Sequence, residues 1–247
     1  MVLKASPAEQ ALLLDIQALD TRLAQIAHRA KSLGQHAVVQ KLVVERAALN
    51  SQLAEQNGVL EDAEIELGRV ESDVSIVEAR IKRDADRLQA TSSVKDVQAL
   101  EQEMTALRKR QGDLEEIELT VMERVDEQSG VVRLTREKVA ALQEHISTVE
   151  AERDVELGTI ETERTNVAAN RAAVAEKVPV DLLALYEKTR ARYGTGASHL
   201  RGGVSSANGV RLNENDMVAI RSAAPDEVLM CPDSFAILIR TDESGLG

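Results

Sequence analysis

The sequence has 247 residues, and 42 acidic side chains against 30 lysines and arginines give a formal net charge of −12 at pH 7. This charge excludes bulk electrostatic attraction to nucleic acid or anionic lipid, although it permits a local basic patch. The single cysteine, Cys231, excludes an internal disulfide and favours a reducing cytoplasm as the expected compartment. We find no signal-peptide core and no run of about 18 apolar residues, so we expect no membrane segment.

Aromatic side chains are confined to the last quarter of the chain, where Tyr186, Tyr193 and Phe235 are the only three. Globular cores draw much of their buried area from large rings, so residues 1–185 do not resemble a compact globule. Their composition, rich in alanine, leucine, glutamate and arginine, is typical of a long helix or coiled coil.

Two long arms, residues 8–89 and 95–178, contain no proline and repeat apolar residues at alternating steps of three and four, which is the coiled-coil period. Ser6 followed by Pro7 suits the start of the first arm. The seam of the first arm runs through Leu12, Ile16, Leu19, Leu23, Ile26, Ala30 and Leu33, and then through Leu49, Leu53, Gln56, Leu60, Ala63, Leu67, Val70, Val74, Val77, Ile81, Asp84 and Leu88. The seam of the second arm runs through Val97, Leu100, Met104, Leu107, Gln111, Leu114, Val121, Val125, Gln128, Val132, Thr135, Val139, Leu142, Ile146 and Val149.

Polar residues interrupt the seam, and they either fix the register of the pairing or mark loosely packed stretches. The phase of the repeat shifts near Leu33 and Gly34, which predicts a kink or a break between two helices there. Residues 90–94 predict the turn between the arms, with Ser92 or Ser93 capping a helix that begins near Lys95. The arms have nearly equal lengths, which favours one chain folding back on itself over a parallel dimer of single helices. Each arm would extend about 120 Å at ~1.5 Å per residue.

A small β-rich module is expected after the arms. The predicted elements are a short helix over 181–193, a flexible glycine-rich link over 196–209, a helix over 216–224 capped by Asn213 or Asn215, β-prone segments over 227–230 and 235–240, and a loose tail over 241–247. We therefore expect a mainly α fold in which residues 1–180 form an antiparallel coiled-coil hairpin and residues 181–247 form the short helix and the module.

No catalytic constellation stands out, and a hydrolase built on Ser92 or Ser93 would lack a base and an oxyanion hole, so we expect no enzyme. Basic residues do cluster. The predicted "basic neck" consists of Lys188, Arg190, Arg192, Arg201 and Arg211. Glu187 is the only acid from 186 to 211, so five cations against one anion leave a local net charge of +4, which can bind phosphates. A second cluster near the hairpin tip contains Arg80, Lys82, Arg83, Arg87, Lys95, Arg108, Lys109 and Arg110. Either cluster could instead simply keep an exposed coil solvated.

Residues 92–127, SSVKDVQALEQEMTALRKRQGDLEEIELTVMERVDE, resemble the tip and second arm of the bacterial coiled-coil hairpin proteins that carry a C-terminal C4-type zinc ribbon. Residues 11–33, 200–204, 210–231 and 235–240 resemble further parts of the same family, so the resemblance covers nearly the whole chain. It implies a nucleic-acid-binding role, since family members are described as predicted nucleic-acid-binding proteins. Some relatives are adaptors or chaperones for flagellar and transcription components, with RNA binding reported among them.

The sequence departs from this family at the two Cys-x-x-Cys knuckles that would hold zinc. The resemblance places the first knuckle at Ser205 and Asn208 and the second at Cys231 and Ser234. Serine and asparagine do not replace thiolates at a soft-ligand site, and His199 with one cysteine does not complete one. We therefore predict no bound metal and no cofactor. The module must then either form a metal-free core or be marginally ordered. The candidate core is Val204, Val210, Leu212, Met217, Ile220, Val228, Leu229, Met230, Phe235, Ile237 and Ile239.

These features predict a non-enzymatic coiled-coil adaptor that contacts nucleic acid, RNA rather than DNA, or a ribonucleoprotein through the neck and the ribbon-like module. The alternative is a purely protein-binding scaffold or chaperone whose coiled coil engages helical partners. Protein partners are expected in either case, and the chain could be a monomer or a dimer.

Overall fold

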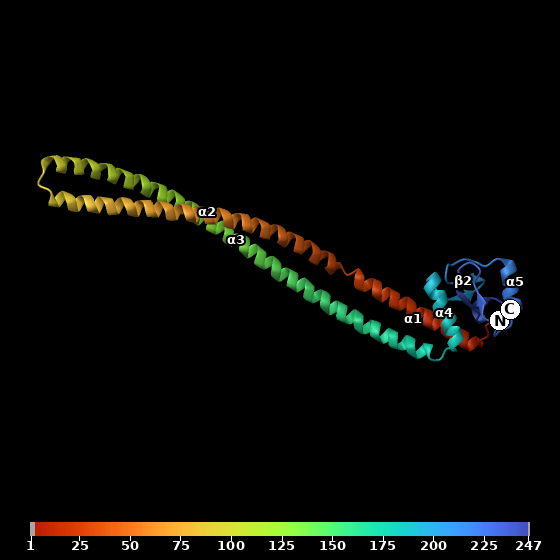
Figure 1. The fold of residues 1–247 in the computed structure, drawn as a ribbon. Helices are drawn as coiled ribbons and strands as arrows, with labels where there is room; N and C mark the ends of the chain where they lie inside the picture. Colours follow the sequence, from red (N-terminus) through yellow and green to blue (C-terminus); the bar gives the residue numbers. More distant parts are fainter. Residues whose placement is uncertain (1–2, 247) are drawn as a thin grey trace. The chain divides into compact units, whose positions relative to one another are not determined.

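The computed structural model describes residues 3–246, and these residues are mainly α-helical with one small sheet near the C-terminus (Figure 1). Two compact units divide the chain: residues 1–34 with 152–247, and residues 35–151. The first unit joins the beginning of the first arm and the end of the second to the C-terminal module. The division of the chain at residue 180 into two domains stays a prediction. Within residues 3–246, no helix has both the length and the apolarity that crossing a membrane requires.

The first arm consists of α1 (Pro7–Lys31) and α2 (Gly34–Ala90), so the predicted break near residue 34 is confirmed. Ser6 caps α1: its hydroxyl accepts from the Glu9 N–H, and the Glu9 carboxylate accepts from the Ser6 N–H, a reciprocal capping box. At the other end, the Ser32 N–H donates to the carbonyls of His28 and Arg29, which closes the last turn of α1. The chain then re-enters helix at Gly34 with a shifted seam.

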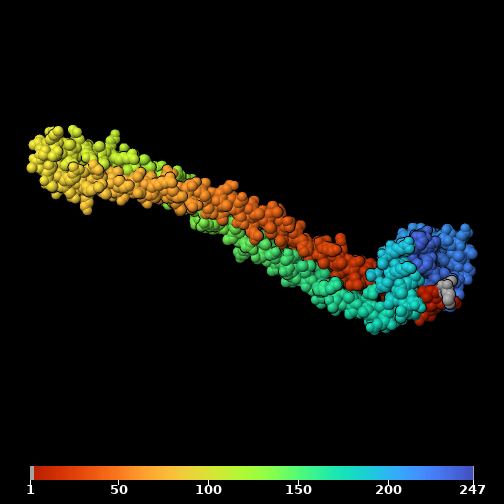
Figure 2. Space-filling view, viewed as in Figure 1, coloured from red at the N-terminus to blue at the C-terminus, as the bar shows by residue number. Residues whose placement is uncertain are grey.

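The second arm is the single helix α3 (Val94–Ala175), and residues 91–93 form the predicted turn. Ser93 is the capping residue, since its hydroxyl accepts from the Asp96 N–H at 3.4 Å. Within residues 35–151 the pairing of α2 with α3 is antiparallel. Arg136 on α3 donates to Asn57 on α2 at 2.9 Å, and Arg80 on α2 donates to Glu103 on α3 at 2.6 Å. Residues further along α2 therefore pair with residues earlier on α3. In the space-filling view the atoms of these two helices meet along this unit (Figure 2).

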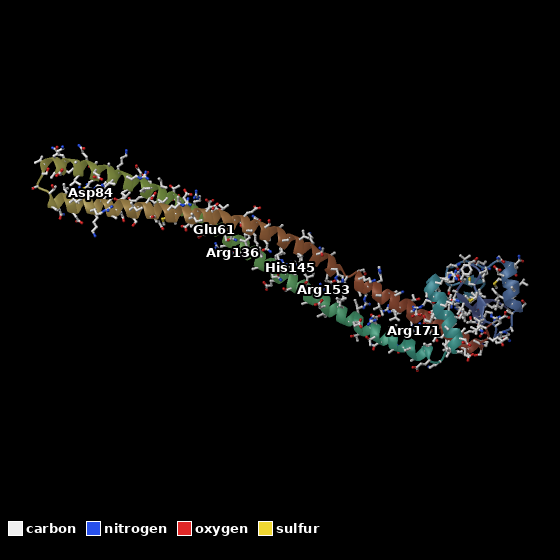
Figure 3. The ribbon with its side chains drawn as sticks, viewed as in Figure 1. Glu61, Asp84, Arg136, His145, Arg153 and Arg171 are labelled. Carbon is white, nitrogen blue, oxygen red and sulfur yellow. The ribbon has the colours of Figure 1, made fainter. Side chains whose placement is uncertain are left out.

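Every predicted seam position is buried or half-buried, which confirms the helical hairpin. Apolar side chains make most of the seam, and Asp84, which lies on α2 near the turn, is the most buried polar side chain there, with 1% exposed (Figure 3). Its carboxylate accepts from Arg80 at 3.0 Å and from Arg87 at 3.3 Å. Two cations of the predicted tip cluster therefore neutralise a buried acid of the same helix.

The C-terminal module contains more regular secondary structure than the sequence predicts. After α4 (Val180–Tyr193) its elements are β1 (Ala197–Arg201), β2 (Val204–Ser205), α5 (Glu214–Ser222), β3 (Leu229–Met230), β4 (Ile237–Ile239) and the 3-10 turn η1 (Asp242–Ser244). The sheet order is β2-β1-β4-β3, and β1 pairs with β4 in parallel while the other pairs are antiparallel. The predicted helices and β-prone segments are confirmed with shifted ends, and Asn213 is the residue that caps α5.

The sequence predictions for two segments of this module are wrong. Residues 196–209 are not a flexible link, because they contain β1, a central strand with Ala197 and Leu200 fully or almost fully buried. The described part of the tail is not loose either. Ser244 in η1 is buried, and its hydroxyl donates to the Leu200 carbonyl at 2.8 Å. Both segments are polar and glycine-rich, and long-range pairing rather than apolar pattern orders them.

The core at the base of the arms is shared by helices and sheet. Leu13 and Ile16 of α1 pack with Leu182 and Tyr186 of α4 and with Ile237 of β4. A Cβ atom at Gly196 would overlap the Tyr186 ring, so only glycine lets the chain pass this ring on its way into β1. A second cluster in the module contains Leu200, Leu212, Met217, Ile220, Cys231 and Leu238. Val210, Met230 and Phe235 were predicted to join the core, but their side chains are exposed.

Candidate functional site

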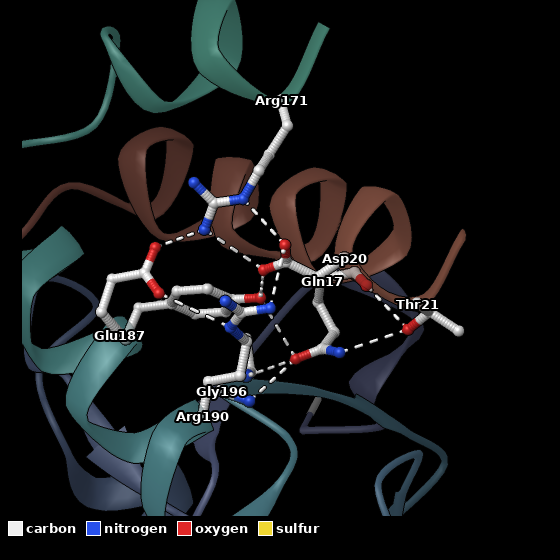
Figure 4. Close-up of polar contacts among 9 residues, drawn as sticks. Gln17, Asp20, Thr21, Arg171, Glu187, Arg190 and Gly196 are labelled. Atoms are coloured by element: carbon white, nitrogen blue, oxygen red, sulfur yellow. Dashed lines mark hydrogen bonds and ion pairs between the residues drawn. The ribbon is translucent and has the colours of Figure 1, made fainter. Parts of the chain in front are cut away.

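A buried carboxylate organises the first unit (Figure 4). The Asp20 side chain on α1, 3% exposed, accepts from the Tyr186 hydroxyl at 2.7 Å and from Arg171 Nε at 2.8 Å. Arg190 of α4 lies 3.1 Å from the same carboxylate. Because Asp20 lies on α1 and its partners lie on α3 and α4, a single charge fixes three helices to one another.

The same network raises the pKa values of two of its members, Arg171 and Tyr186. The hydrogen bond to Asp20 is the main cause that raises the pKa of the Arg171 guanidinium above its usual value, and the pairing with Glu187 adds to it. Burial, followed by the hydrogen bond to Asp20, raises the pKa of the Tyr186 phenol well above its usual value. Nearby, the Gln17 side-chain oxygen accepts from the Gly196 N–H at 2.8 Å, which attaches the entry to β1 to helix α1.

The five residues of the basic neck are not equivalent. Arg190 pairs with Asp20 and Glu187, and Arg201 donates to Glu243 at 2.7 Å, so these two cations are already neutralised. Lys188, Arg192 and Arg211 are exposed, and no acidic side chain within residues 3–246 pairs with any of them. The role of all five in binding stays a prediction, but only these three retain an uncompensated charge.

An aromatic pair lies beside one of these cations, Arg192. The rings of Tyr193, at the end of α4, and Phe235, before β4, are stacked with centroids 5.0 Å apart and planes 22° apart. Both rings are about half exposed, and the Arg192 guanidinium lies 5.2 Å from the Tyr193 centroid. Sequence reasoning missed this pair. The confinement of aromatic residues to the last quarter of the chain was a signal, although it did not indicate that two rings would meet at the surface.

Two residues of the degenerate knuckles, Ser205 and Cys231, lie in contact inside the module. Ser205 Oγ lies 3.5 Å from Cys231 Sγ and 2.7 Å from Ser198 Oγ, all in the buried interior of the module. Burial raises the pKa of the Cys231 thiol, but hydrogen bonds with Ser234 and Ser205 outweigh it and leave the pKa below its usual value. The fourth knuckle residue, Asn208, is exposed and accepts from the Val210 N–H at 3.1 Å.

This set of donors does not suit zinc, because one thiol with serine and asparagine oxygens lacks the thiolate or imidazole ligands of a structural site. The Nε2 atom of His199 lies 2.8 Å from the Thr241 hydroxyl, so this ring nitrogen already has a hydrogen-bond partner. In the part of the chain that is described, no three His, Cys, Asp or Glu side chains gather as a metal site would require. That the protein binds no zinc stays a prediction.

The predicted tip residues have different environments. Ser93 caps α3, whereas Ser92 and Lys95 are exposed. Two neighbouring cations, Arg80 and Arg87, are paired with Asp84. The tip therefore offers less free positive charge than its composition suggests.

The fold defines a coiled-coil hairpin protein with a small C-terminal mixed sheet. The family model of the CT398-like coiled coil hairpin domain matches residues 16–194, and the chain belongs to this family. An uncharacterized protein of Mycobacterium tuberculosis is 32% identical over 241 residues, which cover 97% of this chain and 98% of that protein. An uncharacterized protein of Mycobacterium leprae is 28% identical over 89% of this chain and 95% of its own length.

Solved structures show the same fold. A protein from Mycobacterium smegmatis superposes with a TM-score of 0.86 at 33% identity, covering 96% of this chain and 100% of its own. CT398 from Chlamydia trachomatis gives a TM-score of 0.64 at 18% identity, covering 94% of this chain and 97% of its own. At this lower identity the likeness concerns the fold alone.

Proposed function

We propose that this chain is a non-enzymatic coiled-coil adaptor that contacts nucleic acid through α4 and the C-terminal module. The observation that carries the proposal is the set of three exposed cations, Lys188, Arg192 and Arg211, which have no acidic partner among the described residues of a chain with net charge −12. An acidic protein that leaves such cations uncompensated has exposed positive charge at which phosphates are favoured. RNA is the nucleic acid that the family resemblance implies.

Arg190 and Arg201 have a different role in this proposal from the one that their sequence position predicts. Their carboxylate partners compete with phosphate, so each contributes little to binding unless its ion pair opens. With three phosphate contacts, the logarithm of the binding constant should fall against the logarithm of salt concentration with a slope of about −2 for a single strand. The interaction is therefore expected to be weak at physiological salt and clear at low salt.

The test is fluorescence anisotropy of a labelled RNA oligonucleotide over a salt series. A variant that combines Lys188→Ala, Arg192→Ala and Arg211→Ala should lose most of the binding and most of the salt dependence. The matched control combines Lys31→Ala, Lys41→Ala and Lys138→Ala, which removes the same charge from exposed helical positions elsewhere. Absence of binding at low salt, or an equal loss in both variants, would contradict the proposal.

A second candidate function, a protein-binding scaffold, is favoured by exposed apolar side chains on α2 and α3. Ile76 and Leu119 are 61% and 62% exposed, and neither belongs to the seam between α2 and α3. Helical partners that add a third helix to a coiled coil would cover such residues. Affinity purification with nuclease treatment tests this function: a partner that survives nuclease but is lost from the Ile76→Gln, Leu119→Gln variant would support it, and a partner set unchanged by the substitutions would count against it.

A further inference from the structure

The stacked pair of Tyr193 and Phe235, here called the aromatic platform, is unusual in this chain. The sequence contains only three aromatic residues, and the third, Tyr186, is fully buried in the core. Tyr193 is 42% exposed and Phe235 is 50% exposed, with ring centroids 5.0 Å apart. Two of the three rings therefore stack on each other at the surface, where they contribute little to the core.

The backbone at Phe235 is strained. Its φ of 59° makes it the one non-glycine residue with a positive φ in the part of the chain that is described. Glycine or asparagine usually occupies this left-handed region, because a bulky side chain there is sterically costly. The Phe235 N–H donates to the Cys231 carbonyl at 2.9 Å, so the turn before β4 stabilises this backbone conformation. A large ring at a strained and exposed position points to a binding role rather than a packing role.

The charge around the platform indicates what kind of partner would use it. Arg192 lies over the Tyr193 ring at 5.2 Å, and Lys188 lies one helical turn earlier on α4. Both cations are exposed and have no acidic partner among residues 3–246. Asp233, in the turn that carries Phe235, is also exposed but pairs with neither of them. Exposed rings flanked by unpaired cations suit a ligand that combines flat apolar faces with negative charge.

We propose that the aromatic platform stacks an unpaired base of single-stranded nucleic acid while Arg192 and Lys188 contact the flanking phosphates. This inference rests on the proposed function and narrows its ligand to single strands. A duplex hides the faces of its bases, whereas every base in a single strand presents a face to an aromatic ring. Binding at the platform should therefore tolerate many sequences but require accessible bases.

The experiment measures anisotropy of a labelled single-stranded oligouridylate of about 12 nucleotides, a length within the range of known single-strand sites. Phe235→Asn removes the ring and places a residue that accepts a positive φ, so the turn is retained. Its affinity should fall about tenfold, in the range expected for one stacked base, with an unchanged salt slope. Met230→Asn, at another exposed apolar position of the module, is the matched control and should bind like the wild type.

A complementary probe replaces Tyr193 with tryptophan in this tryptophan-free chain. Single-stranded RNA should quench the fluorescence of the Tyr193→Trp variant, and inorganic polyphosphate, which has charge but no bases, should not. Equal affinity for the annealed duplex, equal competition by polyphosphate, or wild-type binding by Phe235→Asn would overturn the platform. If Phe235→Asn binds normally while the triple cation variant does not, the platform is wrong and the proposed function stands. If the wild type binds no RNA at low salt, both fail.

Discussion

The Tyr186 hydroxyl on α4 donates a 2.7 Å hydrogen bond to the Asp20 carboxylate on α1, and both side chains are almost completely buried. Arg171 and Arg190 complete the shell of this carboxylate from α3 and α4. The candidate nucleic-acid surface begins on the same α4 helix, so the network that holds α4 also fixes where Lys188, Arg192 and Tyr193 are presented.

Asp20→Asn should destabilise the first unit, because it leaves the Arg171 charge partly buried without its main partner. Removing one partner of a buried ion pair lowers the free energy of unfolding by about 3–5 kcal/mol. Because Arg171 and Arg190 are partly exposed, we expect a loss near the lower end of this range, about 3 kcal/mol. Urea unfolding followed by tyrosine fluorescence would measure it, since Tyr186 and Tyr193 both lie in this unit. Asp15→Asn, an exposed acid on the same helix, is the control. If the two variants lose similar amounts of unfolding free energy, the buried network contributes no more to stability than an exposed acid does.

The raised pKa of Tyr186 predicts a specific alkaline weakening. Below the ordinary tyrosine pKa of about 10, the phenol is protonated in both the folded and unfolded states, and its stabilising contribution is complete. Above that pH the unfolded chain releases the proton while the folded chain retains it, so the contribution falls by about 1.4 kcal/mol per pH unit.

Urea unfolding at a series of pH values measures this effect. The stability advantage of the wild type over Tyr186→Phe should shrink as the pH rises above about 10. An advantage that stays constant across this range would contradict the raised pKa.

Asp84→Leu tests whether the polar position in the seam fixes the register of α2 against α3. Replacing a buried ion pair by an apolar residue is often stabilising, and we expect the variant to gain about 1–2 kcal/mol by thermal unfolding. If the acid specifies the pairing, the variant should also form oligomers that the wild type does not form, as sedimentation velocity would detect. A more stable variant with unchanged oligomeric state would indicate that Asp84 marks only a weakly packed stretch.

The predicted absence of bound metal from the C-terminal module can be tested directly. Chelators should not change the unfolding of the wild-type module, because Cys231 is the only thiol at the knuckles. Combining Ser205→Cys, Asn208→Cys and Ser234→Cys supplies four thiolates, and this variant should bind Co²⁺ with thiolate charge-transfer bands that Zn²⁺ displaces. The same bands in the wild type, or a chelator-sensitive wild-type module, would refute the metal-free prediction.

The amino-acid sequence by itself determined the arms. The seam from Leu12 to Val149 follows a local period, the turn at residues 91–93 carries its own capping serine, and the break near Gly34 appears as a shift in phase. Such features depend on residues three or four positions apart, so a single sequence is sufficient to predict them. The replacement of three knuckle cysteines by serine and asparagine can likewise be seen from residue types alone.

Only the tertiary structure decided the C-terminal module and the candidate surface. β1 is ordered because it pairs with β4, about forty residues further along, and no local apolar pattern announces that pairing. Likewise, the sequence counts five cations in the neck, but two of them, Arg190 and Arg201, have a carboxylate partner from a distant segment. Asp20 neutralises Arg190 and Glu243 neutralises Arg201, while Lys188, Arg192 and Arg211 are left free of acids within residues 3–246. The stacking of Tyr193 on Phe235 likewise joins residues far apart in the chain. Contacts of this kind decide which charges and rings are free to bind a ligand, and they cannot be predicted from local sequence.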